Sequence, residues 1–335
     1  MSSALFALVV VAGIGASLWL SSYLIEALRT APKPPATLHW APDIPIQYVE
    51  VDGIKLRFIK SGAGPTLVLL HTLRTQLDLF ERVMPELSKH FTVYALDFPG
   101  HGYSDIPTAR YDAAFFVEAV ESFLDKLNLR DVTLAGVSIG GAIPLIIAAR
   151  HNPRVVRVVA INPYDYAKGR GLARSSLLGW IFNYVSLIPV IGETVMRLRN
   201  FLIVAAVFRG GVVNANSISP ALMKEMYLVG NRPGHYRALI ALLRNSESWE
   251  TATKDYGRIT LPVLFIWGSQ DWARPSERQR DQSLVPGAGT VTVAGGGHFL
   301  PLDKPEAVIS YLKDFATQSG PPAGTVTLIG NLQAK

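Results

Sequence analysis

The sequence predicts an α/β fold built on a parallel sheet, and three observations support this prediction. Short apolar runs rich in Val, Leu and Ile recur along the chain, at residues 66–71, 91–97, 131–138, 156–163 and 262–271. Such runs are typical of strands that are buried on both faces. Stretches with a helical pattern, such as 113–128 and 140–152, lie between these runs, and strands that alternate with helices favour a parallel sheet. The length of 335 residues suits one large domain with an insertion.

The N-terminal segment carries no charged side chain from Ala4 to Ile25. At about 1.5 Å per residue, a helix of this length spans the hydrocarbon core of a bilayer. We therefore expect residues 1–28 to form a single-pass transmembrane anchor. The alternative is a cleaved secretory signal, which usually has a basic start and a shorter apolar core. Basic residues follow the segment and none precedes it, so the domain after the anchor is expected on the cytoplasmic side.

A proline-rich linker, residues 29–46, separates the anchor from the folded part of the chain. The core is expected over residues 47–163 and 256–316 and begins with a hairpin around Asp52-Gly53, because a DG pair between alternating residues is a strong hairpin signal. Residues 317–335 are expected to form a flexible tail.

A long interval without a strand pattern breaks the alternation, and it predicts a helical cap over residues 164–255. The first half of this interval, 164–210, contains six basic and two acidic residues among many apolar ones. This composition suits a surface that meets a membrane. It equally suits helices that bury an apolar face on the core.

Composition and motifs exclude several classes of function. The net charge of +6 comes without a basic stripe interleaved with aromatic residues, so no nucleic-acid partner is expected. No cluster of His, Cys, Asp and Glu has metal-ligand spacing, and neither nucleotide-binding glycine motif, GxGxxG or GxxxxGK[ST], occurs. We expect neither a metal nor an organic cofactor.

Ser138 lies in the sequence AGVSIGG, between an apolar strand pattern and a helical one. A sharp strand-to-helix turn exposes a serine as a nucleophile, and Gly136 and Gly140 relieve crowding around it. A hydroxyl also needs a base that takes its proton. His298 is the candidate base, since it follows a short strand pattern in a glycine-rich loop that leads to a helix.

The acid that orients such a histidine should follow another strand, between the serine and the histidine in the chain. Asp271 in VLFIWGSQDWARP meets this condition, and the order Ser138, Asp271, His298 matches one known arrangement of the catalytic triad. Asp165, which follows the preceding strand pattern, is the rival candidate.

Five motifs occur in register: LLHT, LDFPGHGYSD, GVSIGG, WGSQD and GGGHFLPLDKPEAV. Through them, residues 47–316 resemble the α/β-hydrolase superfamily. The resemblance implies an eight-stranded, mostly parallel sheet flanked by helices, with a helical cap inserted after strand 6. It also implies that no cofactor is used and that an ester-like bond is hydrolysed through an acyl-enzyme.

The resemblance assigns an oxyanion hole to the backbone N–H groups of Leu73 and Ile139. The chain departs from the family here, because His71-Thr72 stands where relatives usually have His-Gly. A β-branched threonine restricts a loop that glycine leaves free, so the hole is expected to differ in shape. Arg74, the next residue but one, is expected to be a solvated loop arginine; the alternative is that it faces an acidic headgroup or leaving group.

These observations predict a membrane-anchored serine hydrolase that cleaves a carboxylic ester through Ser138. The anchor favours a lipid or acylglycerol-like substrate, with membrane lipids as partners, although a small-molecule ester is also compatible. An acyltransferase, a carbon–carbon bond hydrolase or a haloperoxidase-like enzyme can use the same triad. A non-catalytic scaffold is the alternative outside enzymes. Dehalogenases and epoxide hydrolases need an aspartate in place of Ser138.

Overall fold

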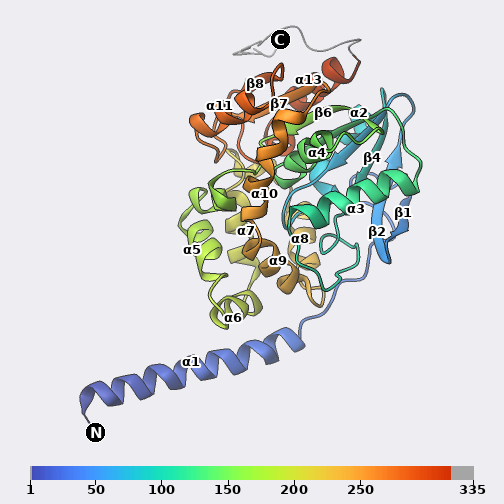
Figure 1. The fold of residues 1–335 in the computed structure, drawn as a ribbon. Coiled ribbons are helices and arrows are strands. Elements are labelled where there is room, and N and C mark those ends of the chain that lie inside the picture. Colours follow the sequence, from blue (N-terminus) through green and yellow to red (C-terminus); the bar gives the residue numbers. More distant parts are fainter. Residues whose placement is uncertain (1, 318–335) are drawn as a thin grey trace.

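A computed structural model describes residues 2–317, and its centre is one twisted sheet (Figure 1). The strand order is β1-β2-β4-β3-β5-β6-β7-β8 within this part of the chain. The strands are β1 (Ile46–Val51), β2 (Ile54–Ser61), β3 (Thr66–Leu70), β4 (Thr92–Leu96), β5 (Val132–Val137), β6 (Val155–Ile161), β7 (Val263–Gly268) and β8 (Gly289–Val293). The expected tail lies outside the described residues after Thr317.

The pairing confirms a mostly parallel sheet. Strands β4, β3, β5, β6, β7 and β8 pair in parallel, whereas β2 is antiparallel to both β1 and β4. The β1–β2 hairpin turns at Asp52 and Gly53, whose φ angles are 49° and 75°. Two central turn residues with positive φ match the right-handed twist of the strands, which explains the DG pair.

Helices cover both faces of the sheet, as predicted. On one face lie α3 (Ala113–Lys126) and α4 (Ile139–Ala149); on the other lie α2 (Met84–Leu87), α12 (Leu300–Asp303) and α13 (Pro305–Thr317). α11 (Pro275–Leu284) connects β7 to β8. Neighbouring residues of β5 belong to opposite apolar layers, Leu134 to one and Ala135 to the other. A strand packed on both faces needs the continuous apolar sequence seen here.

The cap is inserted between β6, the sixth strand, and β7. It contains α5 (Leu177–Val185), α6 (Ile191–Arg197), α7 (Phe201–Arg209), α8 (Pro220–Val229), α9 (His235–Arg244) and α10 (Glu247–Ala252). Side chains of Ser176, Asn200 and Ser219 accept hydrogen bonds from backbone N–H groups in the first turns of α5, α7 and α8. Short 3₁₀ segments are η1 (Leu77–Phe80), η2 (Ala167–Gly169), η3 (Gly171–Arg174), η4 (Ala215–Ser217) and η5 (Thr253–Arg258).

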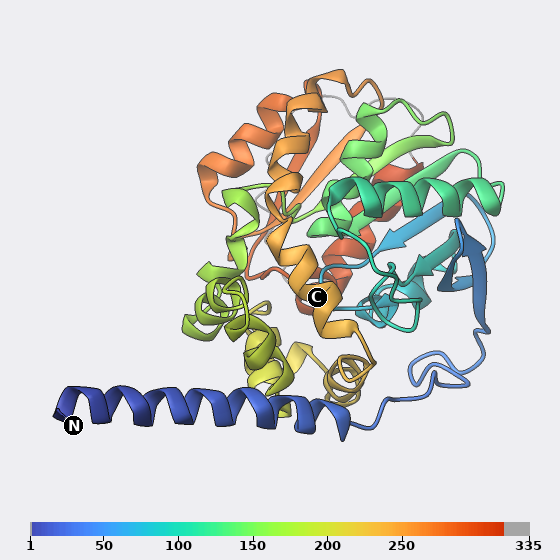
Figure 2. The ribbon, with the colours of Figure 1, turned by 60° about the horizontal axis from the view of Figure 1, so that its bottom comes forward.

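The apolar N-terminal segment forms one helix, α1 (Ser3–Ala27), which is long and apolar enough to cross a membrane, a property that signal sequences share. The N-terminal part of α1 projects beyond the domain, and its C-terminal part lies beside the cap (Figures 1 and 2). The Arg197 side chain of α6 donates a hydrogen bond to Ser22 (2.9 Å) and lies over the ring of Tyr23. Glu26 forms an ion pair with Arg199 (2.7 Å). The end of α1 is thus attached to the cap by specific polar contacts.

Candidate active site

Ser138 occupies the turn between β5 and α4 in a backbone conformation that residues with a side chain rarely adopt. Its φ and ψ angles are 62° and −121°, and the residue is fully buried. Positive φ costs roughly 1–2 kcal/mol for a residue with a Cβ. The turn is held in place because the Ser138 N–H donates to the carbonyl of Ile161 and the Ser138 carbonyl accepts from the N–H groups of Ala142 and Tyr164. Strain of this kind is concentrated at functional sites.

Two glycines allow this turn to pack against the end of β3. A Cβ at Gly140 would lie 2.1 Å from the carbonyl oxygen of His71, and a Cβ at Gly136 would lie 1.9 Å from the carbonyl oxygen of Gly140. Neither contact is possible for a real side chain. The glycines of the AGVSIGG motif are therefore required by the close approach of backbone segments around Ser138.

The structure brings His298 and Asp271 together, on the loops that follow β8 and β7. The Nδ1 atom of His298 lies 2.5 Å from Oδ1 of Asp271, and both side chains are buried. The second carboxylate oxygen of Asp271 accepts a hydrogen bond from the N–H of Ala273 (2.9 Å). A buried carboxylate in this position fixes which imidazole nitrogen carries the proton.

Asp165, the rival acid, belongs to a different cluster. Its carboxylate accepts a hydrogen bond from the Tyr256 hydroxyl (2.7 Å) and pairs with Arg280, near the buried Asp281. Burial raises the pKa of Asp165. Of the two candidate acids, Asp271 is the one that contacts His298.

Two residues that the sequence did not single out hold His298 in place. The indole ring of Trp272 stacks on the imidazole with centroids 3.8 Å apart and planes at 13°. Asn162, at the end of β6, donates to the carbonyls of Gly297 (2.9 Å) and His298 (3.0 Å) and accepts from the N–H of Gly268. Their only sequence signals are their positions, next to Asp271 and at the end of a strand.

The two remaining reactive atoms of the site are unpaired. Ser138 Oγ and His298 Nε2 are both buried and have no hydrogen-bond partner among residues 2–317, so the structure does not join them to each other. Tyr164 lies next to both residues: its N–H donates to the Ser138 carbonyl (3.1 Å), and its ring centroid is 6.0 Å from that of His298. Each unpaired atom is free to bind a reacting group.

The loop after β3 carries the departure from the family pattern at Thr72. The Thr72 N–H donates to Thr75 Oγ1 (3.1 Å), and the Thr72 carbonyl accepts from Thr75 Oγ1 and lies 2.8 Å from His71 Nδ1. His71 Nε2 accepts from the Phe98 N–H, and burial lowers the pKa of His71 well below its usual value. Because Nε2 is an acceptor, His71 is neutral with its proton on Nδ1.

The two predicted oxyanion donors belong to this loop and to the first turn of α4. Leu73 lies on the loop and lines the cavity beside His298, and Ile139 follows Ser138 at the start of α4. Within the described part of the chain, neither backbone N–H donates to a protein acceptor. The Thr72 hydroxyl, which is buried, also has no partner there.

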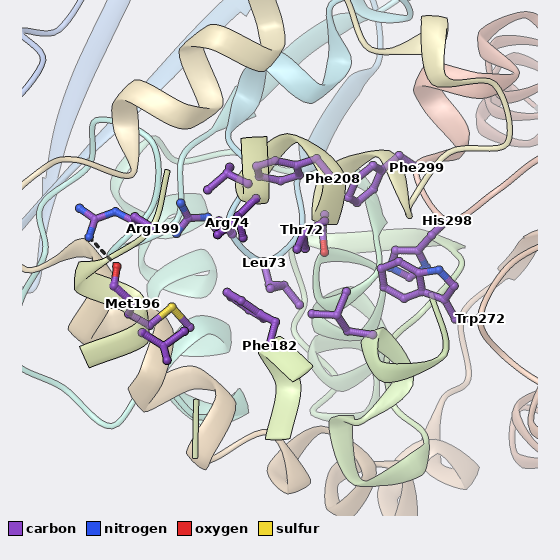
Figure 3. Close-up of a pocket in the computed structure, with 15 residues that line it drawn as sticks. Thr72, Leu73, Arg74, Phe182, Met196, Arg199, Phe208, Trp272, His298 and Phe299 are labelled. Carbon is purple, nitrogen blue, oxygen red and sulfur yellow. Dashed lines mark hydrogen bonds between the residues drawn. The ribbon is translucent and has the colours of Figure 1, made fainter. Parts of the chain in front are cut away.

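A cavity extends from His298 into the cap (Figure 3). One end is formed by His298, Trp272 and Phe299. Leu172 of η3 and helices α5, α6 and α7 supply its mostly apolar middle; the helical residues that line it are Phe182, Val195, Met196, Ile203, Val204, Val207 and Phe208. Such a lining suits an apolar ligand with a few fixed polar contacts.

Arg74 lies at this cavity and corrects an expectation from the sequence. It is buried, with 8% of its surface exposed, and is not a solvated loop arginine. The loop itself is short and polar, but Arg74 is covered by the cap, including Gly230 at the end of α8. Across residues 2–317, no group of three or more His, Cys, Asp or Glu side chains is placed to hold a metal ion.

Comparisons with known proteins agree with this architecture. A family model described as the alpha/beta hydrolase fold matches residues 65–305. An uncharacterized protein of Mycobacterium tuberculosis is 26% identical over 289 residues, which cover 82% of each chain. The 2-hydroxy-6-oxo-2,4-heptadienoate hydrolase of Pseudomonas putida is 26% identical over 273 residues, covering 78% of this chain and 93% of that enzyme.

Among solved structures, the haloalkane dehalogenase DbeA from Bradyrhizobium elkani superposes with a TM-score of 0.72 at 19% identity, covering 82% of this chain and 98% of that one. Similarity at this level of identity shows a shared fold and not a shared reaction. From the family match over most of its folded length, we conclude that the chain belongs to the α/β-hydrolase fold family.

Proposed function

We propose that the protein is a serine hydrolase that cleaves carboxylic esters through an acyl-enzyme on Ser138, with His298 as base and Asp271 as the orienting acid. The observation that carries the proposal is the pair of buried, unpartnered atoms, Ser138 Oγ and His298 Nε2, on two residues that both adjoin Tyr164. Nucleophile, base and acid then come from the ends of β5, β8 and β7, where ligands of α/β sheets bind.

In the proposed reaction, Ser138 Oγ attacks the acyl carbon while His298 Nε2 takes the hydroxyl proton. The carboxylate of Asp271 stabilises the imidazolium, and the N–H groups of Leu73 and Ile139 bind the oxyanion of the tetrahedral intermediate. His298 next gives its proton to the leaving alcohol, which leaves an acyl-serine. Water, deprotonated by the same histidine, releases the acid and restores Ser138. Each oxyanion donor is expected to contribute about 3–4 kcal/mol to the transition state.

We further propose that α1 anchors the protein in a membrane and that the cap rests on the bilayer surface. Helices α5, α6 and α7 of the cap expose many large apolar residues, with Leu177 exposed by 75% and Leu202 by 77%. They belong to the same helices, α5 and α7, whose other sides line the cavity. An extended exposed apolar surface marks a site that contacts a membrane or another protein, and its neighbour here is a helix with the length of a membrane span.

This arrangement favours a lipid or acylglycerol-like ester, because the cavity lies directly behind the helices proposed to meet the bilayer. Arg29 and Lys33, which follow α1, support a cytoplasmic position for the domain. Hydrolysis of a carbon–carbon bond is the second candidate reaction, favoured by the similarity to the Pseudomonas putida hydrolase. That reaction would need the same three residues.

Labelling with a fluorophosphonate probe tests the serine hydrolase proposal directly. We expect the full chain in detergent to label at Ser138, and we expect Ser138→Ala and His298→Ala to abolish labelling. Ser283→Ala is the matched control, since Ser283 lies on the exposed side of α11. A folded chain that does not label, or that labels equally after Ser138→Ala, would refute the proposal. A screen of p-nitrophenyl esters and a vinylogous 1,5-diketone then separates ester cleavage from carbon–carbon cleavage.

Flotation with phospholipid vesicles tests the membrane contact. The full chain is expected to float, and the double substitution Leu177→Ser with Leu202→Ser is expected to weaken turnover of vesicle-embedded esters without weakening turnover of soluble ones. Equal loss on both kinds of substrate would show that these residues support the fold and not the contact with lipid.

A further inference from the structure

Arg74 is a buried cation with no partner at the cavity next to the proposed oxyanion loop. Its Nη1 and Nη2 atoms are buried and make no hydrogen bond to any of the described residues. Its backbone has a φ of 56°, a conformation that residues with a side chain rarely adopt. A buried cation is normally paired, and an apolar residue would fill this place at lower cost. Strained backbone and an unpaired guanidinium together indicate a ligand-binding role.

The surroundings of Arg74 contain more positive than negative charge. Arg199 lines the same cavity, and Arg29 lies close enough to act electrostatically on Arg74. Glu26 pairs with both Arg29 (3.0 Å) and Arg199 (2.7 Å), so one carboxylate serves two guanidinium groups and leaves that of Arg74 unneutralised. His101 and His235 also lie close enough to interact electrostatically with Arg74, and neither supplies a negative charge.

Burial, followed by the repulsion from Arg199 and Arg29, lowers the pKa of Arg74 to about 9. Since this value lies above neutral pH, the side chain remains a cation. Its Nη2 atom lies beside Gly230, the residue that ends α8, where an added Cβ would be 2.6 Å away. The C-terminal end of a helix favours a nearby cation, but it provides no hydrogen-bond acceptor to Arg74 here.

The position of Arg74 along the cavity defines the kind of ligand. Arg74 and Arg199 lie at the side opposite to His298 and Trp272, with Leu73 and Thr72 between them (Figure 3). The lining between these two ends is mostly apolar. A ligand with its reacting carbonyl near His298 would therefore pass apolar side chains before it reaches the two guanidinium groups.

We propose that Arg74, assisted by Arg199, binds an anionic oxygen group, a carboxylate or a phosphate, at the far end of an ester substrate whose apolar part fills the cavity. The planar guanidinium presents two parallel N–H donors, which match two oxygens of either group. The inference deepens the proposed function and rests on it as far as hydrolysis is concerned. Binding of the anion itself requires only the cavity.

Binding to the full chain carrying Ser138→Ala tests this proposal independently of turnover. The probes are hexanoate, hexyl phosphate and hexanol, titrated by calorimetry in detergent, and they share one apolar chain. We expect at least one of the two anions to bind more tightly than the alcohol, and Arg74→Met to weaken that anion by about 30-fold or more. The preferred anion distinguishes a carboxylate from a phosphate ligand.

Arg209→Met is the matched control, because Arg209 is an exposed arginine at the end of α7. It is expected to leave all three affinities unchanged. If Arg74→Met does not fold, as judged by thermal melting, Arg74→Lys replaces it; the charge remains but the two-pronged donor is lost, so weaker binding of the anion is still expected. Unchanged anion affinity in the folded variant, or no preference for either anion over hexanol, would overturn the proposal.

Kinetics connects this site to the reaction. We expect the ratio of kcat/KM for mono-p-nitrophenyl glutarate to that for p-nitrophenyl valerate to fall by about 30-fold or more in Arg74→Met. An unchanged ratio would refute a role for Arg74 in substrate selection. Absence of fluorophosphonate labelling in the unsubstituted chain would instead defeat the serine hydrolase proposal, and the calorimetric result would still decide whether Arg74 binds an anion.

Discussion

Replacing Asp271 with asparagine is the sharpest test of the proposed triad, because the two side chains have the same shape and differ in charge and in donors. One carboxylate oxygen of Asp271 faces His298 Nδ1 and the other accepts from the N–H of Ala273. An asparagine has only one acceptor oxygen for these two positions. If its carbonyl keeps the Ala273 contact, its amide N–H₂ faces His298 Nδ1 and forces the imidazole proton onto Nε2. That tautomer cannot take a proton from Ser138.

The loss of charge sets the minimum size of the effect. With charges about 4 Å apart and an effective dielectric constant of about 20, the attraction between the Asp271 carboxylate and the imidazolium is about 4 kcal/mol. At about 1.4 kcal/mol per factor of ten, this corresponds to roughly a 10³-fold loss of kcat. The unfavourable tautomer raises the expected loss to about 10⁴-fold.

The assay compares kcat for a soluble p-nitrophenyl ester in the unsubstituted chain, in Asp271→Asn and in Asp165→Asn, with thermal melting as the control for folding. Asp165→Asn is expected to change the melting temperature but to leave the pH dependence of kcat nearly unchanged, since Asp165 contacts Tyr256 and Arg280 and not His298. A folded Asp271→Asn protein that retains more than about a tenth of the activity would refute the reasoning, because the predicted loss is much larger.

Three further predictions concern stability and positioning. Gly140→Ala should lower the melting temperature and abolish activity, because its Cβ would lie 2.1 Å from a backbone oxygen. Gly257→Ala is the control and should leave the melting temperature unchanged, because the nearest atom to its Cβ would be 4.0 Å away. Equal melting temperatures for the two variants would contradict the close packing around Gly140. Trp272→Leu should lower kcat by about tenfold by removing the ring stacked on His298, and an unchanged kcat would show that the stack is dispensable. Burial lowers the pKa of His101 to about 4, below the unfolded value, so stability should be lost as the pH falls from about 6.5 to 4, by roughly 3 kcal/mol from this residue. In urea unfolding, His101→Gln should lower the free energy of unfolding, relative to the unsubstituted chain, by less at pH 4.5 than at pH 7.5. An identical decrease at both pH values would assign the pH dependence to other groups.

The sequence alone predicted most of the fold because the signals for strands and turns are local. The apolar runs that became β3 to β7 are recognisable from a few neighbouring residues, since a strand buried on both faces is apolar at nearly every position. The DG pair defined the first hairpin, and the glycines around Ser138 marked a turn in which backbone segments touch. The chain order of Ser138, Asp271 and His298 then named the candidates for the site.

Which of the two acids contacts His298 was decided only by tertiary structure. Asp165 and Asp271 both follow apolar strand patterns, so their local sequences are equivalent. They differ in their partners: Tyr256 and Arg280 occupy the carboxylate of Asp165, and His298 occupies that of Asp271. These partners lie 27 or more residues away along the chain, and no pattern of neighbouring residues contains them.

The same limit explains why Arg74 was expected in solvent and why the contact between α1 and the cap was not expected at all. Arg74 is surrounded in the sequence by polar loop residues, but it is buried by segments more than a hundred residues further on, at Arg199 and Gly230. Glu26 and Arg199 are 173 residues apart. Secondary structure follows from interactions within a few residues and could be predicted from the sequence; burial and charge pairing depend on which distant segments meet, and only the folded chain determines that.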